Sequence, residues 1–357
     1  MSPKISLIMS VYNGEDYLLE AVESVINQTF TDWELIIIND CSTDSTAQIL
    51  SDCAERDPRI KVHTNEVNLR LPSSLNKALS LAEGKYIGRM DADDVCLPNR
   101  LEKQYAFMEK HPGIALSSCR FMTIKNGVIS SGGCGGKCDF DSVKAMLLVT
   151  NPLLHPGIIA RASAIKDLGY DKNFTCTEDL ELWTRFVMAG HKIEILPEYL
   201  MLYRLHDKQI TGTTLEKQHK EVVLVQKNYF DNVLNQMDNE QEQFYINGIY
   251  FTNDINTKKF GKFYRWLKTV NRKTKSFKME SISYAMFEIL AQYKRKGLPK
   301  LKLVKAMLLF GPLFLLKEIP ARKKRALADG LKCIEAAKTI GLEHTGGSLE
   351  FPTFSKR

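Results

Sequence analysis

Four short apolar runs alternate with three amphipathic segments in the first 90 residues, and this alternation limits the folds that the chain can adopt. The runs are rich in β-branched residues, which favours strands, and the segments between them have apolar side chains at helical spacing. The runs cover residues 4–11, 33–38, 60–62 and 86–90, and the helical segments cover 15–29, 44–56 and 75–82. This alternation predicts an α/β fold with a parallel sheet and helices on both of its faces.

Polar residues follow the predicted strands at the edge where ligands of open α/β sheets bind. The first strand ends in Ser10-Val11-Tyr12-Asn13, whose backbone amide and aromatic ring could contact a flat base. The second ends at Asp40, which could accept a hydrogen bond from a base N–H. The sequence contains no G-x-G-x-x-G and no G-x-x-x-x-G-K-[ST]. We therefore expect a metal ion, and not a glycine-rich loop, to hold any phosphate at this edge.

An acidic cluster, Asp91-Ala92-Asp93-Asp94, follows the fourth predicted strand. Carboxylates this close together repel one another and are costly to desolvate unless a cation or hydrogen-bond donors meet them. We expect Asp91 and Asp93 to hold a divalent metal, which would in turn hold a diphosphate. The alternative is a solvated turn in which Asp94 caps the helix that follows Pro98, and for Asp94 itself we favour this role as a cap.

Several motifs in this half resemble family 2 glycosyltransferases, which have the GT-A fold, a mostly parallel sheet flanked by helices. They are residues 5–13 (ISLIMSVYN), 28–35 (QTFTDWEL), 39–44 (NDCSTD) and 84–94 (GKYIGRMDADD), with Pro98, Arg100 and Leu101. The resemblance extends over residues 3–210. It implies that a sugar is transferred with inversion from a nucleoside-diphosphate donor, assisted by Mg²⁺ or Mn²⁺.

The resemblance also implies roles for individual residues. Ser10, Tyr12, Asn13 and Asp40 would bind the base and ribose, Asp91 the ribose or the metal, and Asp93 the metal. The family's usual aspartate pair is Asn39-Asp40 here, and the glycine that often follows it is Cys41. Because the acid matched to base recognition is the second of the pair, Asp40 keeps that role.

A second acidic pair, Glu178-Asp179, opens a predicted helix that runs to Ala189, with Thr177 as its expected N-cap. The two acids could simply favour the positive N-terminus of this helix. A transferase also needs a carboxylate that takes the proton of the acceptor hydroxyl. The segment resembles the family's Glu-Asp helix start, which implies that Asp179 is the base, with Glu178 as the second candidate.

Residues 203–206 (YRLH) resemble the family's closing Tyr-Arg-x-His segment. The resemblance implies that His206 completes the metal shell or contacts the diphosphate, and that Arg204 pairs with phosphate. Imidazole suits Mn²⁺ as a ligand, but a surface histidine without a function is the alternative. We assign His155, in a His-Pro-Gly turn, to an acceptor loop and not to a metal.

Charge divides the chain into an acidic body and a basic C-terminal region. The net charge is +7, yet residues 257–325 contain 20 Lys and Arg against three acids, so the remainder is acidic. Basic residues in 258–325 flank the apolar run 306–316 (AMLLFGPLFLL), which is too short to span a bilayer. We expect this region to bind an anionic membrane surface. The alternative is a core helix packed on the catalytic region, and nucleic acid is not expected as a partner.

These features predict a GT-A domain at 1–212, a basic helical membrane-associating region at 213–340 and a disordered tail at 341–357. Within the first, residues 1–100 form the nucleotide-binding half and 101–212 the acceptor half. The eight scattered cysteines predict a reduced, cytoplasmic protein. The basic C-terminal region adds the expectation that the protein is peripheral on the inner membrane. The one close pair, Cys134 and Cys138, is expected to lie in a glycine-rich loop and not at a zinc site.

The expected activity is transfer of a hexose or N-acetylhexosamine from a nucleotide sugar, with UDP as the expected nucleotide, to a lipid-diphosphate-linked glycan. The setting expected from family analogy is bacterial surface polysaccharide synthesis, such as O-antigen or capsule. Two alternatives stay open. A sugar nucleotidyltransferase would need a basic glycine-rich loop after the first strand, and a non-catalytic membrane-docking protein would not need Asp40, Asp91, Asp93 and Asp179.

Overall fold

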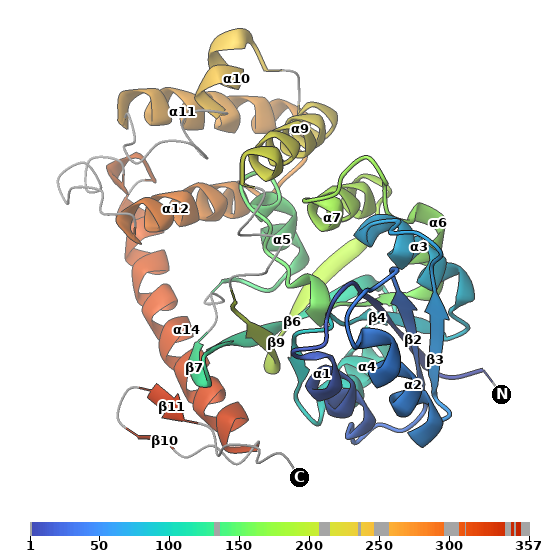
Figure 1. The fold of residues 1–357 in the computed structure, drawn as a ribbon. Coiled ribbons are helices and arrows are strands. Elements are labelled where there is room, and N and C mark those ends of the chain that lie inside the picture. Colours follow the sequence, from blue (N-terminus) through green and yellow to red (C-terminus); the bar gives the residue numbers. More distant parts are fainter. Residues whose placement is uncertain are drawn as a thin grey trace.

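The computed structural model describes residues 2–131, 136–206, 215–234, 237–245, 257–295, 307–310, 312–339, 344–345 and 348–350. A curled sheet with helices against it forms the first part of the chain, and the helices from residue 215 onward lie beside it (Figure 1). The strands are β1 (Ile5–Val11), β2 (Trp33–Asn39), β3 (Ile60–Thr64), β4 (Tyr86–Arg89), β5 (Val95–Cys96), β6 (Ile114–Lys125), β7 (Val128–Ser131), β8 (Ile159–Arg161), β9 (Lys192–Arg204), β10 (His344–Thr345) and β11 (Ser348–Glu350).

The first four strands form the parallel sheet that the alternation predicts. Their order is β3, β2, β1 and β4, and the pairs β1–β2, β2–β3 and β1–β4 are all parallel. β1 and β2 are mostly apolar because both faces of the sheet are covered, whereas the edge strand β3 is only partly buried. Along β2, Leu35 and Ile37 belong to one hydrophobic cluster, whereas Ile36 and Ile38 belong to the cluster on the opposite face. The prediction of four strands in a parallel sheet is confirmed.

Helices cover both faces of this sheet. They are α1 (Leu18–Ile26), α2 (Thr46–Arg56), α3 (Leu71–Leu81), α4 (Arg100–Lys110), α5 (Phe140–Met146), the 3₁₀ turn η1 (His155–Gly157), α6 (Ala162–Leu168) and α7 (Glu178–Met188). Apolar residues of α1, α2 and α4 belong to the cluster on one face, and those of α3, α5, α6 and α7 to the cluster on the other. The antiparallel strand β8 lies between β4 and β6 and extends the sheet beyond β4. In this arrangement the first turn of α7 lies near the end of β4, since the charges of Arg89 and Asp91 act on Glu178.

The C-terminal helices are α9 (Leu215–Val233), α10 (Asn239–Tyr245), α11 (Thr257–Thr274), α12 (Met279–Arg295), the 3₁₀ turn η3 (Leu308–Phe310) and α14 (Pro312–Thr339). Their buried residues belong to the same hydrophobic cluster as those of α5 and α7. The helical region therefore shares a core with the sheet region, and the division of the chain near residue 212 stays a prediction.

The apolar run 306–316 packs largely into this core. Phe310 contacts the rings of Tyr264, Phe287 and Phe314, and it is buried. Leu316, by contrast, is exposed, at 72%. The structure thus favours the alternative of a core helix over insertion of this run into a membrane; Ala306 and Gly311 lie outside the described residues. Among the described helices, none combines the length and the apolar character that a bilayer crossing requires.

The C-terminal tail differs in part from its predicted disorder. β10 and β11 form an antiparallel pair, and β11 pairs with β7, so these five residues add to the edge of the sheet. The other residues of 341–357, and Cys134 of the predicted glycine-rich loop, lie outside the described residues.

Candidate active site

Two turns at the carboxyl ends of β1 and β2 are tied together by side-chain hydrogen bonds. The backbone N–H of Asn13 donates to Ser42 Oγ at 3.0 Å, and the Thr43 N–H donates to Asn13 Oδ1 at 2.9 Å. Asn13 and Cys41 both have positive φ, at 53° and 63°. Glycine adopts this conformation without a steric cost, which explains why the motif often has glycine where this chain has Cys41.

The Asp40 side chain is buried and held rigidly. Its Oδ1 accepts hydrogen bonds from Asn65 Nδ2 at 2.7 Å and from the Leu69 N–H at 2.8 Å. Asn65 is held in turn by Ser74 and Lys77, at 2.9 and 2.7 Å. Within the described residues both bonds to Asp40 go to the same oxygen, so Oδ2 is the atom that could meet a base. The sequence predicts no role for Asn65, because nothing in the local pattern indicates that its side chain reaches Asp40 at the end of β2.

Ser10 and Tyr12 lie at the same edge, at the end of β1. Ser10 is partly buried, whereas the Tyr12 side chain is exposed at 53%. An exposed aromatic ring beside a buried carboxylate can bind a flat base by stacking while the carboxylate accepts a hydrogen bond. The four residues predicted to bind the base and ribose are therefore gathered at one edge of the sheet.

The acidic cluster lies directly after β4, at the same edge. Carboxylate oxygens of Asp91, Asp93 and Asp94 all lie within 4.8 Å of one another. Arg89, which is buried at the end of β4, pairs with both oxygens of Asp91; one of these contacts is 2.5 Å long. Asp93 Oδ2 lies 2.9 Å from His206 Nε2. The structure thus brings together the residues predicted to ligate the metal.

Asp94 does not cap the following helix, so that prediction is wrong. α4 begins at Arg100, with Asn99 in the N-cap position. Asp94 is fully buried instead, and its Oδ1 accepts the Arg204 N–H at 2.8 Å. Among the described residues, its Oδ2 is buried with no hydrogen-bond partner. Such an orphaned carboxylate oxygen is costly, and a cation would relieve this cost.

The electrostatics of the cluster also favour the binding of a cation. Burial, together with the charges of Asp91 and Asp93, raises the pKa of Asp94 well above its ordinary value. Burial also raises the pKa of Asp91, against the opposing effect of Arg89. Carboxylate oxygens are the ligands that Mg²⁺ and Mn²⁺ prefer, and a histidine nitrogen also suits Mn²⁺. The donor set of Asp91, Asp93, Asp94 and His206 therefore fits a divalent metal, with Asp94 as a candidate that the sequence analysis did not include.

Arg204 connects the acidic cluster to α1. Its Nε donates to the backbone oxygen of Asp93 at 2.7 Å, and one terminal nitrogen pairs with Glu20 at 2.5 Å. Its guanidinium also lies 4.5 Å from the centre of the Tyr17 ring. A phosphate could reach Arg204 only in competition with Glu20, so its predicted pairing with phosphate stays a prediction.

The candidate base Asp179 lies in the first turn of α7. Its Oδ2 accepts a hydrogen bond from Asn151 Nδ2 at 2.6 Å, and its Oδ1 accepts the Leu180 N–H, also at 2.6 Å. Burial raises the pKa of Asp179, and these hydrogen bonds act in the opposite direction. A base must stay ionised to accept a proton, so Asn151 both orients the carboxylate and favours its charged form.

Glu178 is more deeply buried than Asp179. It faces His155 Nδ1 at 3.6 Å, and His155 Nε2 lies 2.9 Å from the Tyr170 hydroxyl. Burial, with the charge of Arg89, lowers the pKa of His155 to about 3, so this histidine is neutral near pH 7. The carboxylates of Asp179 and Asp91 both act on His155 in the opposite direction. The acidic cluster and the start of α7 therefore face each other across His155 and Arg89.

Burial also raises the pKa of Glu178 to about 7, from its ordinary 4.5. A raised folded pKa contributes stability that is complete below pH 4.5 and is lost as the pH rises to about 7. The free energy of unfolding of the wild type should therefore fall by about 3 kcal/mol between pH 4.5 and pH 7. We expect this fall to be absent in Glu178→Gln. Chemical denaturation at several pH values tests this. The exposed Glu55→Gln should leave the profile unchanged, and a Glu178→Gln profile parallel to that of the wild type would contradict the raised pKa.

Arg100 holds the backbone that directly precedes the acidic cluster. It is fully buried, and its guanidinium donates to the backbone oxygens of Arg89 at 2.8 Å and Ile158 at 3.3 Å. It thereby links the end of β4 to the turn before β8. Arg100 belongs to one of the family motifs, but the sequence predicts no role for it. Only the fold reveals that its partners are backbone oxygens.

The arrangement of the sheet is that of a GT-A fold. The structure superposes on the crystal structure of S. aureus TarS 1–349 in complex with UDP-GlcNAc with a TM-score of 0.55 and 18% identity, covering 99% of this chain and 97% of that one. The predicted fold class is confirmed.

Sequence comparison identifies the family. The model for glycosyl transferase family 2 matches residues 6–134. An uncharacterized glycosyltransferase of Methanocaldococcus jannaschii is 32% identical over 252 residues, covering 70% of this chain and 84% of the relative. The O-antigen biosynthesis glycosyltransferase WbnJ of Escherichia coli is 33% identical over 223 residues, covering 59% and 83%. The chain belongs to glycosyltransferase family 2, as its motifs predict.

Proposed function

We propose that this chain transfers a hexose or N-acetylhexosamine, with inversion, from a nucleoside-diphosphate sugar to a lipid-diphosphate-linked glycan at the cytoplasmic membrane surface. The observation that carries the proposal is the placement of two acidic centres at one sheet edge. Asp91, Asp93 and Asp94 form one, and Asp179 with Glu178 forms the other across His155 and Arg89. Transfer from a nucleotide sugar needs both a site for the diphosphate and a proton acceptor for the acceptor hydroxyl.

The donor end of the proposed site is the pair of turns after β1 and β2. Asp40 accepts a hydrogen bond from the base, and Tyr12 contacts its ring. UDP is the expected nucleotide, consistent with TarS, which shares the fold and was solved with UDP-GlcNAc. Asp93, Asp91, Asp94 and His206 hold Mn²⁺ or Mg²⁺. A divalent ion there would neutralise the charge of the leaving diphosphate as a Lewis acid.

The acceptor end of the proposed site is the first turn of α7. Asp179 Oδ2, which Asn151 orients, takes the proton of the acceptor hydroxyl as that oxygen attacks the anomeric carbon. Neutral His155 and the buried Glu178 exclude water behind the base. Direct displacement assisted by a base inverts the anomeric centre, so an α-linked donor gives a β-linked product.

The acceptor class is supported by the O-antigen biosynthesis relative and by the charge of the C-terminal region. Since the apolar run 306–316 is largely packed inside, the proposed membrane contact is electrostatic. α11 has basic residues on its exposed face: Lys258, Lys262, Arg265, Arg272 and Lys273. Each such residue near an anionic leaflet contributes about 1 kcal/mol.

The membrane contact leads to a prediction for substitutions on α11. We expect the combined Arg265→Glu, Arg272→Glu and Lys273→Glu variant to bind vesicles containing phosphatidylglycerol about 100-fold more weakly, because three basic residues are lost. Cosedimentation measures this. Deleting residues 294–325 would be uninformative, since it removes buried side chains such as Phe310.

A matched control reverses the same number of exposed charges elsewhere. Lys110→Glu, Lys125→Glu and Lys172→Glu change residues outside the C-terminal helices. If both triple variants lose vesicle binding equally, net charge rather than the α11 face is responsible, and the proposed surface is wrong.

The proposed reaction is tested by screening nucleotide sugars for hydrolysis with and without Mn²⁺. The panel contains UDP-, GDP- and dTDP-linked hexoses and N-acetylhexosamines, and released nucleoside diphosphate is measured. We expect one UDP-sugar to be hydrolysed only with a divalent ion. Release of pyrophosphate instead, or no metal-dependent hydrolysis of any donor, would contradict the proposal.

A further inference from the structure

A buried glutamate interrupts the apolar face of α9. The inward face of this helix contains Val225, Tyr229 and Phe230, and one turn before them, on the same buried face, lies Glu221. The Glu221 side chain is only 9% exposed. A buried carboxylate is costly unless hydrogen-bond donors surround it, so its surroundings account for its presence.

The hydrogen-bond donors come from the three residues that precede the catalytic acids, and the Lys217 ammonium of α9 pairs with Glu221 Oε1 at 3.7 Å. Glu221 Oε2 accepts the Cys176 N–H at 2.9 Å and the Thr177 hydroxyl at 3.1 Å, and Oε1 accepts the Thr175 N–H at 3.4 Å. Thr177 occupies the N-cap position of α7, but its side chain makes no capping bond within that helix. The prediction that Thr177 is the N-cap residue is confirmed, but its hydroxyl donates to Glu221 of α9 and does not accept a bond from α7.

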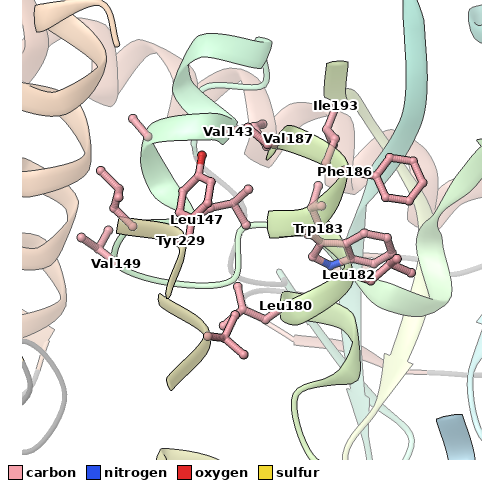
Figure 2. Close-up of a cluster of buried hydrophobic side chains, with 14 of the residues drawn as sticks. Val143, Leu147, Val149, Leu180, Leu182, Trp183, Phe186, Val187, Ile193 and Tyr229 are labelled. Atoms are coloured by element: carbon pink, nitrogen blue, oxygen red, sulfur yellow. The ribbon is translucent and has the colours of Figure 1, made fainter. Parts of the chain in front are cut away.

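The C-terminal helices also hold the segment on the other side of Asp179. Gln226 Nε2 donates to the Leu147 oxygen at 3.1 Å, and the Tyr245 hydroxyl donates to the Leu148 oxygen. This segment leads to Asn151, whose amide orients Asp179. Figure 2 shows Leu147 and Val149 of this segment, Leu180 of α7 and Tyr229 of α9 in one buried cluster.

We propose that Glu221 is a positioning residue for Glu178 and Asp179, and that the helical region from residue 215 thereby builds the acceptor side of the active site. The inference rests on the proposed function, because it assumes that these two acids serve the transfer. Glu221 contacts neither substrate nor metal in this arrangement; it acts through the backbone at residues 175–177. The helical region from residue 215 then supports catalysis by positioning the two acids, in addition to making the proposed membrane contact.

A charge effect accompanies the hydrogen bonds. The negative charge of Glu221 is one of the causes that raise the pKa of Glu178. A glutamine at 221 keeps one acceptor oxygen but loses this charge. The two substitutions Glu221→Ala and Glu221→Gln therefore separate the loss of hydrogen bonds from the loss of charge.

The experiment measures kcat and KM of the full chain with Mn²⁺ and the nucleotide sugar hydrolysed fastest in the screen. We expect Glu221→Ala to lower kcat about 10- to 100-fold with little change in the donor KM, since the base is displaced while the donor site is untouched. Glu221→Gln should recover most of this kcat, because it keeps an oxygen that accepts hydrogen bonds from the backbone before α7. The matched control is Glu216→Ala, an exposed glutamate on the same helix that is expected to behave as wild type.

Two results would overturn the inference. One is a kcat for Glu221→Ala equal to that of Glu216→Ala. The other is a loss of kcat that Glu221→Gln does not recover and that is accompanied by an equal weakening of the donor KM, which indicates a purely structural role. The variant Asp179→Asn, measured alongside, keeps the two hypotheses apart. If it retains turnover, the proposed base is wrong; if it is inactive while Glu221→Ala is fully active, only the role of Glu221 is wrong.

Discussion

Replacing Asp93 with alanine is expected to lower metal-dependent release of UDP by about 100- to 1000-fold. Asp91 is already paired with Arg89, and Asp94 is fully buried, whereas the Asp93 side chain is 29% exposed and lies beside His206. It is thus the carboxylate most available to a metal. Metal assistance at a leaving group contributes several kcal/mol, and each 1.36 kcal/mol is tenfold in rate. Release of nucleoside diphosphate measures the effect.

Measurements of stability distinguish a loss of metal binding in Asp93→Ala from a loss of folding. Without metal, Asp93→Ala should be at least as stable as the wild type, because it removes a charge that repels Asp91 and Asp94. Mn²⁺ should raise the melting temperature of the wild type but not of the variant. The exposed Asp52→Ala on α2 serves as the control and should keep full activity. Undiminished activity of Asp93→Ala would show that Asp93 is not a metal ligand.

The second large effect is expected for Asp179→Asn. The substitution keeps the size of the side chain but removes the group that accepts the proton, so transfer should fall about 10²- to 10⁴-fold. Binding of UDP in Mn²⁺ should stay unchanged, because Asp40 and the acidic cluster are separate from α7. Calorimetry gives the binding constant, and a transfer assay gives the rate.

Two comparisons sharpen the assignment of the base. Glu178→Gln should retain more activity than Asp179→Asn, since its buried carboxyl has a pKa of about 7 and is only partly ionised near neutral pH. Asp167→Asn, at an exposed position on α6, should have no effect. If Glu178→Gln is the more severe of the two, the base is Glu178 and the roles are exchanged.

The sheet was predictable because its pattern is local. β1 to β4 are short, mostly apolar runs, and each ends at a turn rich in Asn, Asp or Ser. Since parallel strands end at a common edge, the placement of Asp40 and Asp93 at the same edge of the sheet was predictable. The pairing of β8 between β4 and β6 was not visible in this way, because it depends on contacts between distant parts of the chain.

What the sequence did not reveal are partners that only tertiary structure brings together. Asn151 reaches Asp179 from 28 positions away, and Glu221 reaches Cys176 from 45. Arg89 follows Gly88 in a strand, where an arginine suggests an exposed edge, yet it is buried against Asp91. Asp94 was assigned to a cap because aspartate favours that position in general. The run 306–316 has a composition that suits both a membrane surface and a core, and only packing decides between them.

The most direct test of the account is a calorimetric titration of UDP into the wild-type protein and into Asp93→Ala, each with Mn²⁺ and with a chelator. If the acidic cluster holds a metal that holds the diphosphate, UDP should bind the wild type about tenfold or more tightly with Mn²⁺ than with the chelator. Asp93→Ala should bind UDP equally weakly in both. Equal affinity of the wild type with Mn²⁺ and with the chelator, or an unchanged response to Mn²⁺ in Asp93→Ala, would contradict the central claim.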